Sequence, residues 1–192
     1  MLTCLYDIFR LSHKRESEST GKQFMFLTRT WSLIEHREIM SGFPKTESLT
    51  PRSDFQVLFR HDAQITLIQS NIQPSLENSQ TKQVTIEPVV GRSYYFRTAI
   101  NSVSKQSRTR KQFSVQPDDW LKSRDFGADF SVQSAIQTLR VEESKGRKVP
   151  IDHWTLWGTL VVTDSDRLTS VIRSGIGRGR AWGCGLLSIV EA

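Results

Sequence analysis

Short runs of alternating apolar and polar residues fill the first half of the chain, around one longer segment with helical spacing. Apolar residues recur every three or four positions from Phe24 to Ile34, which predicts an amphipathic helix over residues 24–41 that ends at Gly42. β-Branched and aromatic runs predict strands over residues 1–11, 55–60, 64–69 and 84–90. The order strand, helix, hairpin and final strand is typical of a ferredoxin-like unit.

The second half of the chain repeats this order. We expect its strands over residues 93–103, 131–142, 154–163 and 182–190. A capped helix start at residues 117–121 and helical spacing over residues 164–174 predict the helices, and residues 104–111 form a basic loop. The sequence therefore predicts an α+β fold of two tandem ferredoxin-like (βαββαβ) domains, over residues 1–90 and 91–192.

Composition excludes several classes of protein. Apolar residues make up 37% of the 192 positions and charged residues 24%, which is ordinary for a globular protein. No run approaches the roughly 20 apolar residues of a spanning helix, and no signal peptide is evident, so we expect a cytoplasmic protein without a membrane partner. The two cysteines, Cys4 and Cys184, lie in no metal-binding spacing, so we expect neither a metal site nor a cofactor.

Basic residues exceed acidic ones, with 26 Lys and Arg against 20 Asp and Glu and a net charge of +6. This surplus favours a polyanionic partner, although it also fits a merely soluble basic protein. The predicted 104–111 loop concentrates positive charge at Lys105, Arg108, Arg110 and Lys111. Such a loop suits an arm along an RNA backbone, but an exposed charged loop would have the same composition.

A glycine-rich loop between the last predicted helix and strand carries the most specific signal. It covers residues 175–187 and holds Gly175, Gly177, Gly179, Gly183 and Gly185. The spacing matches neither a dinucleotide-binding fingerprint nor a Walker A loop. Arg178 and Arg180 lie between the glycines, so a phosphate backbone could bind the loop amides and both guanidiniums. The alternative is a tight connection in which glycine only relieves steric strain.

Several segments together resemble one known family. They are the tail GIGRGRAWGCGLLSI, the preceding TLWGTLVVTDSDRLTSVIRSGIG, the stretch SDFQVLFRHDAQITLIQSNIQP and the helix segment EHREIMSGFP. These resemble the CasE-type endoribonucleases that process CRISPR RNA in the type I-E Cascade complex, within the repeat-associated RAMP superfamily. The resemblance is strong over residues 154–189, moderate over 33–74 and weak over 1–30.

The resemblance implies a metal-independent endoribonuclease that binds the stem-loop of a CRISPR repeat and cuts at its 3′ base. The 2′-OH attacks the neighbouring phosphate and leaves a 2′,3′-cyclic phosphate and a 5′-OH. The implied partners are the 3′ handle of the crRNA and other Cascade subunits, especially the adjacent backbone subunit. A general base and a general acid are needed, and histidine suits either role.

His36 matches the catalytic histidine of the family, and the alternative is a helix-surface histidine without a role. The expected RNA-binding residues are Arg37, Lys105, Arg108, Arg110, Lys111, Gly175, Gly177, Arg178, Gly179 and Arg180. Many relatives carry tyrosine three residues before the histidine, where this chain has Leu33. Two alternatives therefore stay open: a hairpin-binding cap with weak or no cleavage, and a structural subunit related to the backbone proteins. The other histidines are weaker candidates: His13 in a polar loop, His61 at a predicted hairpin tip and His153 before a strand.

Overall fold

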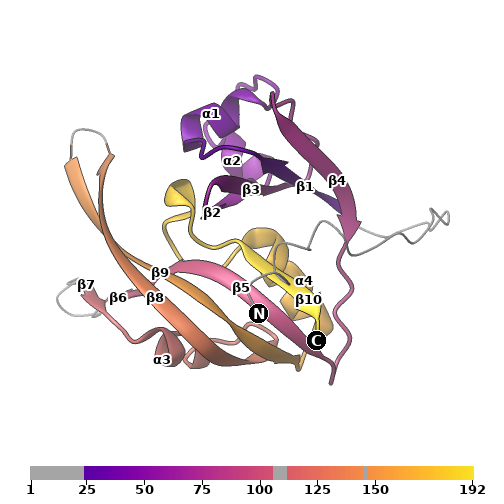
Figure 1. Cartoon of the computed structure of the whole chain (residues 1–192), viewed down its shortest axis with the longest axis vertical. Helices are drawn as coiled ribbons and strands as arrows, with labels where there is room; N and C mark the ends of the chain where they lie inside the picture. The colour runs from indigo at the N-terminus through magenta and orange to yellow at the C-terminus, as the bar shows by residue number, and fades with distance from the viewer. Residues whose placement is uncertain (1–23, 106–111, 145–146) are drawn as a thin grey trace.

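Two four-stranded antiparallel sheets, each with helices packed against it, form most of the described chain (Figure 1). The computed structural model describes residues 24–105, 112–144 and 147–192. Both sheets have the strand order of a ferredoxin-like unit, with the first strand between the third and the fourth. The predicted α+β fold of two tandem ferredoxin-like units is confirmed, while the limits 1–90 and 91–192 stay a prediction.

The N-terminal unit has the sheet order β2-β3-β1-β4. Its strands are β1 (Phe24–Thr30), β2 (Leu58–Asp62), β3 (Ile65–Ser70) and β4 (Ser79–Thr85). Two short helices, α1 (His36–Ser41) and α2 (Pro51–Asp54), connect β1 to β2. Ile39 of α1 is fully buried and packs with Phe43, Phe59 and Ile68, so the apolar side of α1 is fixed against the sheet.

The C-terminal unit has the sheet order β10-β5-β9-β8. Its main strands are β5 (Ser93–Asn101), β8 (Ala128–Ser144), β9 (Arg147–Val162) and β10 (Leu187–Glu191), with a small pair formed by β6 (Val103–Lys105) and β7 (Gln112–Ser114). Two helices, α3 (Pro117–Lys122) and α4 (Ser165–Ser174), and the 3-10 turn η2 (Arg180–Trp182) complete the unit. Trp120 of α3 and Leu168 and Ile172 of α4 pack on Phe96 and Leu156 of the sheet in one core.

The predicted helix over residues 24–41 is wrong for its first part. Residues 24–30 form β1, which pairs with both β3 and β4, and the helix occupies only residues 36–41. The strand was not recognised because two of its buried positions are polar. Thr28 and Thr30 are buried with their hydroxyls hydrogen-bonded, so only the three-to-four spacing of the apolar residues from Phe24 to Ile34 was visible in the sequence. The predicted end at Gly42 is confirmed, and the predicted strand over residues 1–11 lies outside the described residues.

Two other predicted strands of the N-terminal unit are displaced. The last strand is β4 over residues 79–85, not 84–90, because this edge strand is mostly polar and gives little hydrophobic signal. The hairpin turns at Ala63, whose φ is 54°, within the expected turn of residues 61–63, but β2 continues to Asp62, two residues beyond the expected end of the strand. His61 therefore lies within β2 and not at the hairpin tip.

The C-terminal unit follows its predicted order closely. The β8–β9 hairpin includes the predicted strands apart from residue 163, extends further toward its tip, and projects from the body of the unit (Figure 1). Asp164 caps α4 by accepting a hydrogen bond of 2.9 Å from the Arg167 amide. The final strand starts at Leu187, five residues after Trp182, because η2 intervenes. His153 is 6% exposed within β9.

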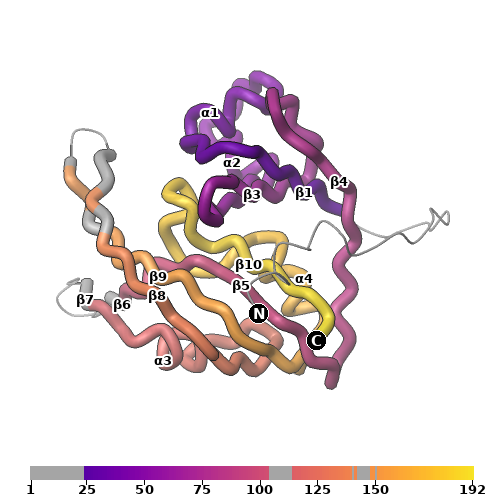
Figure 2. Tube along the Cα trace, in the orientation of Figure 1, coloured from indigo at the N-terminus to yellow at the C-terminus, as the bar shows by residue number. Residues whose placement is uncertain are grey.

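Polar side chains fix the two units against each other, and residues 86–92 connect them along one side (Figure 2). The buried Arg60 guanidinium of β2 donates to both oxygens of Asp62 at 2.9–3.1 Å and to the Arg97 carbonyl of β5 at 2.9 Å. The Arg97 guanidinium pairs with the same carboxylate at 2.9 Å. Gln69 of β3 donates to the Ile172 carbonyl of α4 at 2.9 Å. This network sets the position of the glycine-rich loop relative to α1 and α2.

Across the described part of the chain, none of the helices combines the length and the apolar character needed to span a membrane.

Candidate active site

His36 is the first residue of α1 and lies half-buried beside β2. Its ring is 6.1 Å from the ring of Phe59, centroid to centroid. The Nε2 atom is buried and has no hydrogen-bond partner among the described residues. Burial, and then the positive charge of Arg52, lower the pKa of His36 below its ordinary value of 6.5. The imidazole is therefore neutral at pH 7 and able to accept a proton.

Arg52 brings a positive charge close to His36, and Arg180 of the other unit lies close to Arg52. Arg52 lies in α2, and its Nη1 donates to the Val57 carbonyl at 3.3 Å. Arg180 lies in η2, and its Nη2 donates to the Gly175 carbonyl at 3.2 Å. Burial, and then the charge of Arg180, lower the pKa of Arg52. No ion pair found among the described residues includes either guanidinium.

We call His36, Arg52 and Arg180 the cationic cluster. The two partly buried guanidiniums carry like charges with no counter-ion among the described residues, which costs free energy in the unliganded protein. A phosphate group would offset that cost by accepting hydrogen bonds from both guanidiniums. The cluster therefore has the chemistry of a site for a phosphodiester.

The glycine-rich loop packs directly against β2 beside the cationic cluster. A Cβ on Gly183 would lie 3.3 Å from Cε2 of Phe59 and 3.7 Å from Cδ2 of His61. A Cβ on Gly175 would lie 2.7 Å from Leu58, and the φ of Gly175 is 78°. Figure 1 shows the loop after α4 rising toward β2. Residues that are far apart in the sequence thus meet at one edge of the N-terminal sheet.

Steric requirements account for the glycines at these positions. Gly177, Gly179 and Gly185 also have positive φ values, between 70° and 96°. The tight-connection alternative thus explains why glycine occurs here, since a side chain would clash or strain the backbone. Whether the loop amides of Gly175, Gly177 and Gly179 also bind RNA stays a prediction.

The structure separates the other predicted RNA-binding residues. Arg37 is exposed on α1, next to His36 in the sequence. Arg178 is exposed, and its charge acts on Arg124, which lies just after α3. Lys105 lies in β6, while Arg108, Arg110, Lys111 and His13 fall outside the described residues. The predicted role of each residue stays a prediction.

Two residues at this site were not expected there from the sequence: Arg52, which was not a candidate, and His61, which was only a weak one. Arg52 belongs to no motif, and only the tertiary fold brings it to Arg180. His61 was placed at a hairpin tip, but its ring lies 5.4 Å from Phe59 and its Nδ1 lies 3.1 Å from Oγ1 of Thr66. The one sequence signal for His61 was its position in a strand. Side chains alternate between the two faces of a strand, so residues 59 and 61 lie on the same face.

The position expected for a family tyrosine holds an exposed apolar side chain. Leu33 is 57% exposed in the segment between β1 and α1. It supplies no hydroxyl that could donate or accept a proton. Any second proton-transfer group must therefore come from another residue or from solvent.

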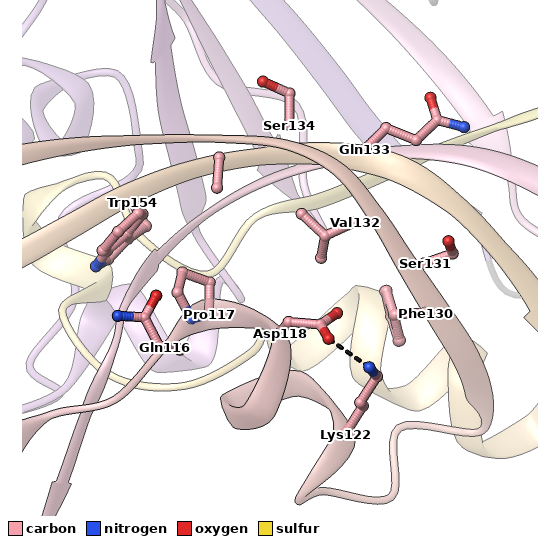
Figure 3. A pocket seen from close by; sticks show the side chains of 11 residues that line it. Gln116, Pro117, Asp118, Lys122, Phe130, Ser131, Val132, Gln133, Ser134 and Trp154 are labelled. Atoms are coloured by element: carbon pink, nitrogen blue, oxygen red, sulfur yellow. Dashed lines mark hydrogen bonds and ion pairs between the residues drawn. The ribbon is translucent and has the colours of Figure 1, made fainter.

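A separate pocket of about 560 Å³ opens between α3 and β8 (Figure 3). Trp154, Gln116 and Asp118 are among its lining side chains, and none of the predicted site residues lines it. Asp118 is already paired with Lys122. Within the described ranges, no cluster of three or more His, Cys, Asp or Glu side chains could hold a metal ion.

Solved structures share this fold over nearly the whole chain. The CRISPR endoribonuclease Cse3 bound to a 19-nucleotide RNA has a TM-score of 0.72 and 21% identity, covering 89% of this chain and 100% of that one. Cas6e from Escherichia coli K-12 has a TM-score of 0.64 and 20% identity, covering 88% and 100%. A chain of a CRISPR RNA-guided surveillance complex has a TM-score of 0.62 and 20% identity, covering 87% and 100%. At such identities the likeness shows the fold.

The sequence itself gives the family. A search of curated proteins finds no match. A family model described as CRISPR associated protein matches residues 32–190, which include α1, the cationic cluster and the glycine-rich loop. This chain belongs to that family of CRISPR-associated proteins.

Proposed function

We propose that this protein is a metal-independent endoribonuclease that cleaves CRISPR repeat stem-loops in precursor crRNA and retains the 3′ hairpin as a subunit of a Cascade-type complex. Its family, and its fold shared with an RNA-bound endoribonuclease and with a subunit of a surveillance complex, support this substrate and this assembly. The observation that carries the proposal is the cationic cluster, in which an imidazole with a lowered pKa lies near Arg52, and Arg52 lies near Arg180 of the other unit.

The reaction is a transesterification within the RNA. The 2′-OH gives its proton to the His36 imidazole, and the 2′ oxygen forms a bond to the neighbouring phosphorus. The bond from phosphorus to the 5′ oxygen then breaks, and that oxygen takes a proton from water. The His36 imidazolium returns its proton to the hydroxide that this leaves. The products are a 2′,3′-cyclic phosphate and a 5′-OH, so atoms and charges balance without a metal ion.

We assign His36 the role of general base because of its environment. Protonation would add positive charge to a half-buried ring that already lies near Arg52, so the neutral form predominates at pH 7. Arg52 and Arg180 would bind the scissile phosphate and stabilise the charge that develops on it. Because these arginines come from different units, the RNA would lie across the junction between them.

A hairpin-binding cap with weak or no cleavage is the second candidate function. The observation that favours it is Leu33, an exposed side chain without a hydroxyl where the resemblance leads us to expect tyrosine. Binding by this fold would not require that tyrosine. Both functions place the same RNA on the same surface and differ only in the chemistry.

Mass spectrometry of the RNA that copurifies with the protein tests the proposal. We expect a defined repeat hairpin, and we expect the protein to convert an unprocessed repeat transcript into a 5′ fragment that ends in a 2′,3′-cyclic phosphate. An intact repeat that stays bound after incubation would support the cap instead. Absence of any repeat hairpin, together with no binding to a synthetic one, would contradict both functions.

A further inference from the structure

The glycine-rich loop also contacts α3, at a place separate from the cationic cluster. A Cβ on Gly177 would lie 2.9 Å from Cη2 and Cζ2 of Trp120, and the φ of Gly177 is 70°. Trp120 is 2% exposed and belongs to the core of the C-terminal unit. The backbone immediately before Arg178 is therefore fixed against a rigid surface.

Arg124 is held in place on the same tryptophan. Its guanidinium carbon lies 4.0 Å from the centre of the Trp120 ring. Its Nη1 donates to the Trp120 carbonyl at 2.7 Å and to Oγ of Ser123 at 2.9 Å. These contacts use one nitrogen of the guanidinium, and its other N–H groups make no hydrogen bond with the described residues.

Arg178 brings a second guanidinium close to Arg124. Burial, and then the charge of Arg178, lower the pKa of Arg124. The two like charges therefore repel each other. Two carboxylates of this segment are engaged elsewhere: Asp118 pairs with Lys122, and Asp125 accepts from the Gly127 amide and pairs with Arg167. Within the described ranges, no acidic side chain pairs with Arg124 or Arg178.

We infer that Arg124 and Arg178 form a second phosphate-binding site, which holds an RNA phosphate other than the scissile one. A pre-positioned guanidinium next to an exposed one suits the oxygens of a single phosphate group. Arg180 lies near Arg52, whereas Arg178 lies near Arg124. One short loop would therefore contact the RNA backbone at two places. This inference rests on the proposed function, because it takes the same RNA as its ligand.

Binding measurements with charge-changing variants test this site. The probe is a fluorescein-labelled RNA with the repeat hairpin of the source genome's own CRISPR array, followed by anisotropy over a series of KCl concentrations. We expect Arg178→Ala to weaken binding about tenfold and to lower the slope of log Kd against log salt by about one. Arg178→Glu should weaken binding further. The matched control is Arg92→Ala, which removes an exposed arginine paired with Glu191 and should leave both quantities unchanged.

A scan of single methylphosphonate substitutions identifies the phosphate. We expect one position to weaken binding to the wild-type protein but not to Arg178→Ala or Arg124→Gln, and that position should not be the scissile phosphate. If Arg124→Gln does not fold, the comparison of the wild-type protein with Arg178→Ala alone tests the second site. Wild-type binding with no effect of the Arg178 variants, or an effect confined to the scissile position, would overturn the second site but not the proposed function. No hairpin binding by the wild-type protein would overturn both.

Discussion

Arg52 of the N-terminal unit lies close enough to Arg180 of the C-terminal unit for their like charges to interact, with no acidic partner for either among the described residues. The contacts that bring them together are the buried network around Asp62 and the packing of the glycine-rich loop on β2. The fold therefore holds an unfavourable pair of like charges close together in the unliganded protein.

Removing either guanidinium of the cationic cluster should slow cleavage. We expect Arg52→Ala and Arg180→Ala each to lower the single-turnover rate by about 100-fold, because each would leave the developing phosphorane charge less stabilised. Lysine at either position should restore part of the rate, since it keeps the charge but loses the bidentate geometry. Rates as fast as those of the Arg92→Ala control would contradict this role.

The pH dependence of cleavage should report the lowered pKa of His36. For a general base, kcat/KM falls as the pH drops through the pKa of the free enzyme, so the midpoint should lie below 6.5. Arg52→Ala removes the second cause of the shift and should move the midpoint up toward 6.5. NMR titration of His36 in both proteins provides the independent check. A rate that instead falls as the pH rises through this range would show that His36 acts as an acid.

A hydroxyl at position 33 should strengthen the chemistry if its absence limits the rate. We expect Leu33→Tyr to raise the single-turnover rate about tenfold, which is less than the roughly 100-fold or more of a well-positioned general acid or base. Leu33→Phe is the matched control, because it adds the ring without the hydroxyl. Equal rates for the two variants would show that Leu33 does not limit cleavage.

The buried network between the units should make a large contribution to stability. Asp62→Ala would leave the Arg60 guanidinium buried without its carboxylate, at a cost of about 3–5 kcal/mol. Urea unfolding measures this, with Asp125→Asn as a control because the Asp125 side chain is 80% exposed. A loss no larger than that of the control would contradict the structural role of the network.

The same carboxylate predicts an acid-sensitive stability. Burial raises the pKa of Asp62, but the charges of Arg60 and Arg97 and the hydrogen bonds from Arg60 outweigh it, so the pKa is lowered. Its contribution is complete above the unfolded pKa of about 3.9 and is lost as the pH falls through the folded value. We expect the wild-type free energy of unfolding to fall below about pH 4, and the Asp62→Asn protein to show a weaker decline.

The C-terminal unit was predictable because its signals are local. Asp164 caps α4, Gly175 takes a positive φ just after it, and the strands of the long hairpin are rich in β-branched residues. In the N-terminal unit, β1 contains threonines that are buried only because β3 and β4 pair on both sides. Its helical spacing was therefore a coincidence that a single sequence does not reveal.

The candidate site was predictable only in part, for a similar reason. His36 was identified from the resemblance of its segment, and the glycine-rich loop from its composition. The relation of Arg52 to Arg180 depends on how the two sheets dock, which no spacing within the sequence encodes. The same holds for Arg124 and Arg178: Arg124 stacks on Trp120, and Gly177, the residue before Arg178, packs against the same ring.

The most direct test of the proposed function is single-turnover cleavage of a repeat transcript in EDTA by the wild-type protein and by His36→Ala. We expect the wild-type protein to produce a fragment with a cyclic phosphate, and we expect the variant to bind the hairpin almost as tightly without cleaving it. Cleavage by His36→Ala at the wild-type rate, or cleavage by the wild-type protein only when divalent metal is present, would contradict the account.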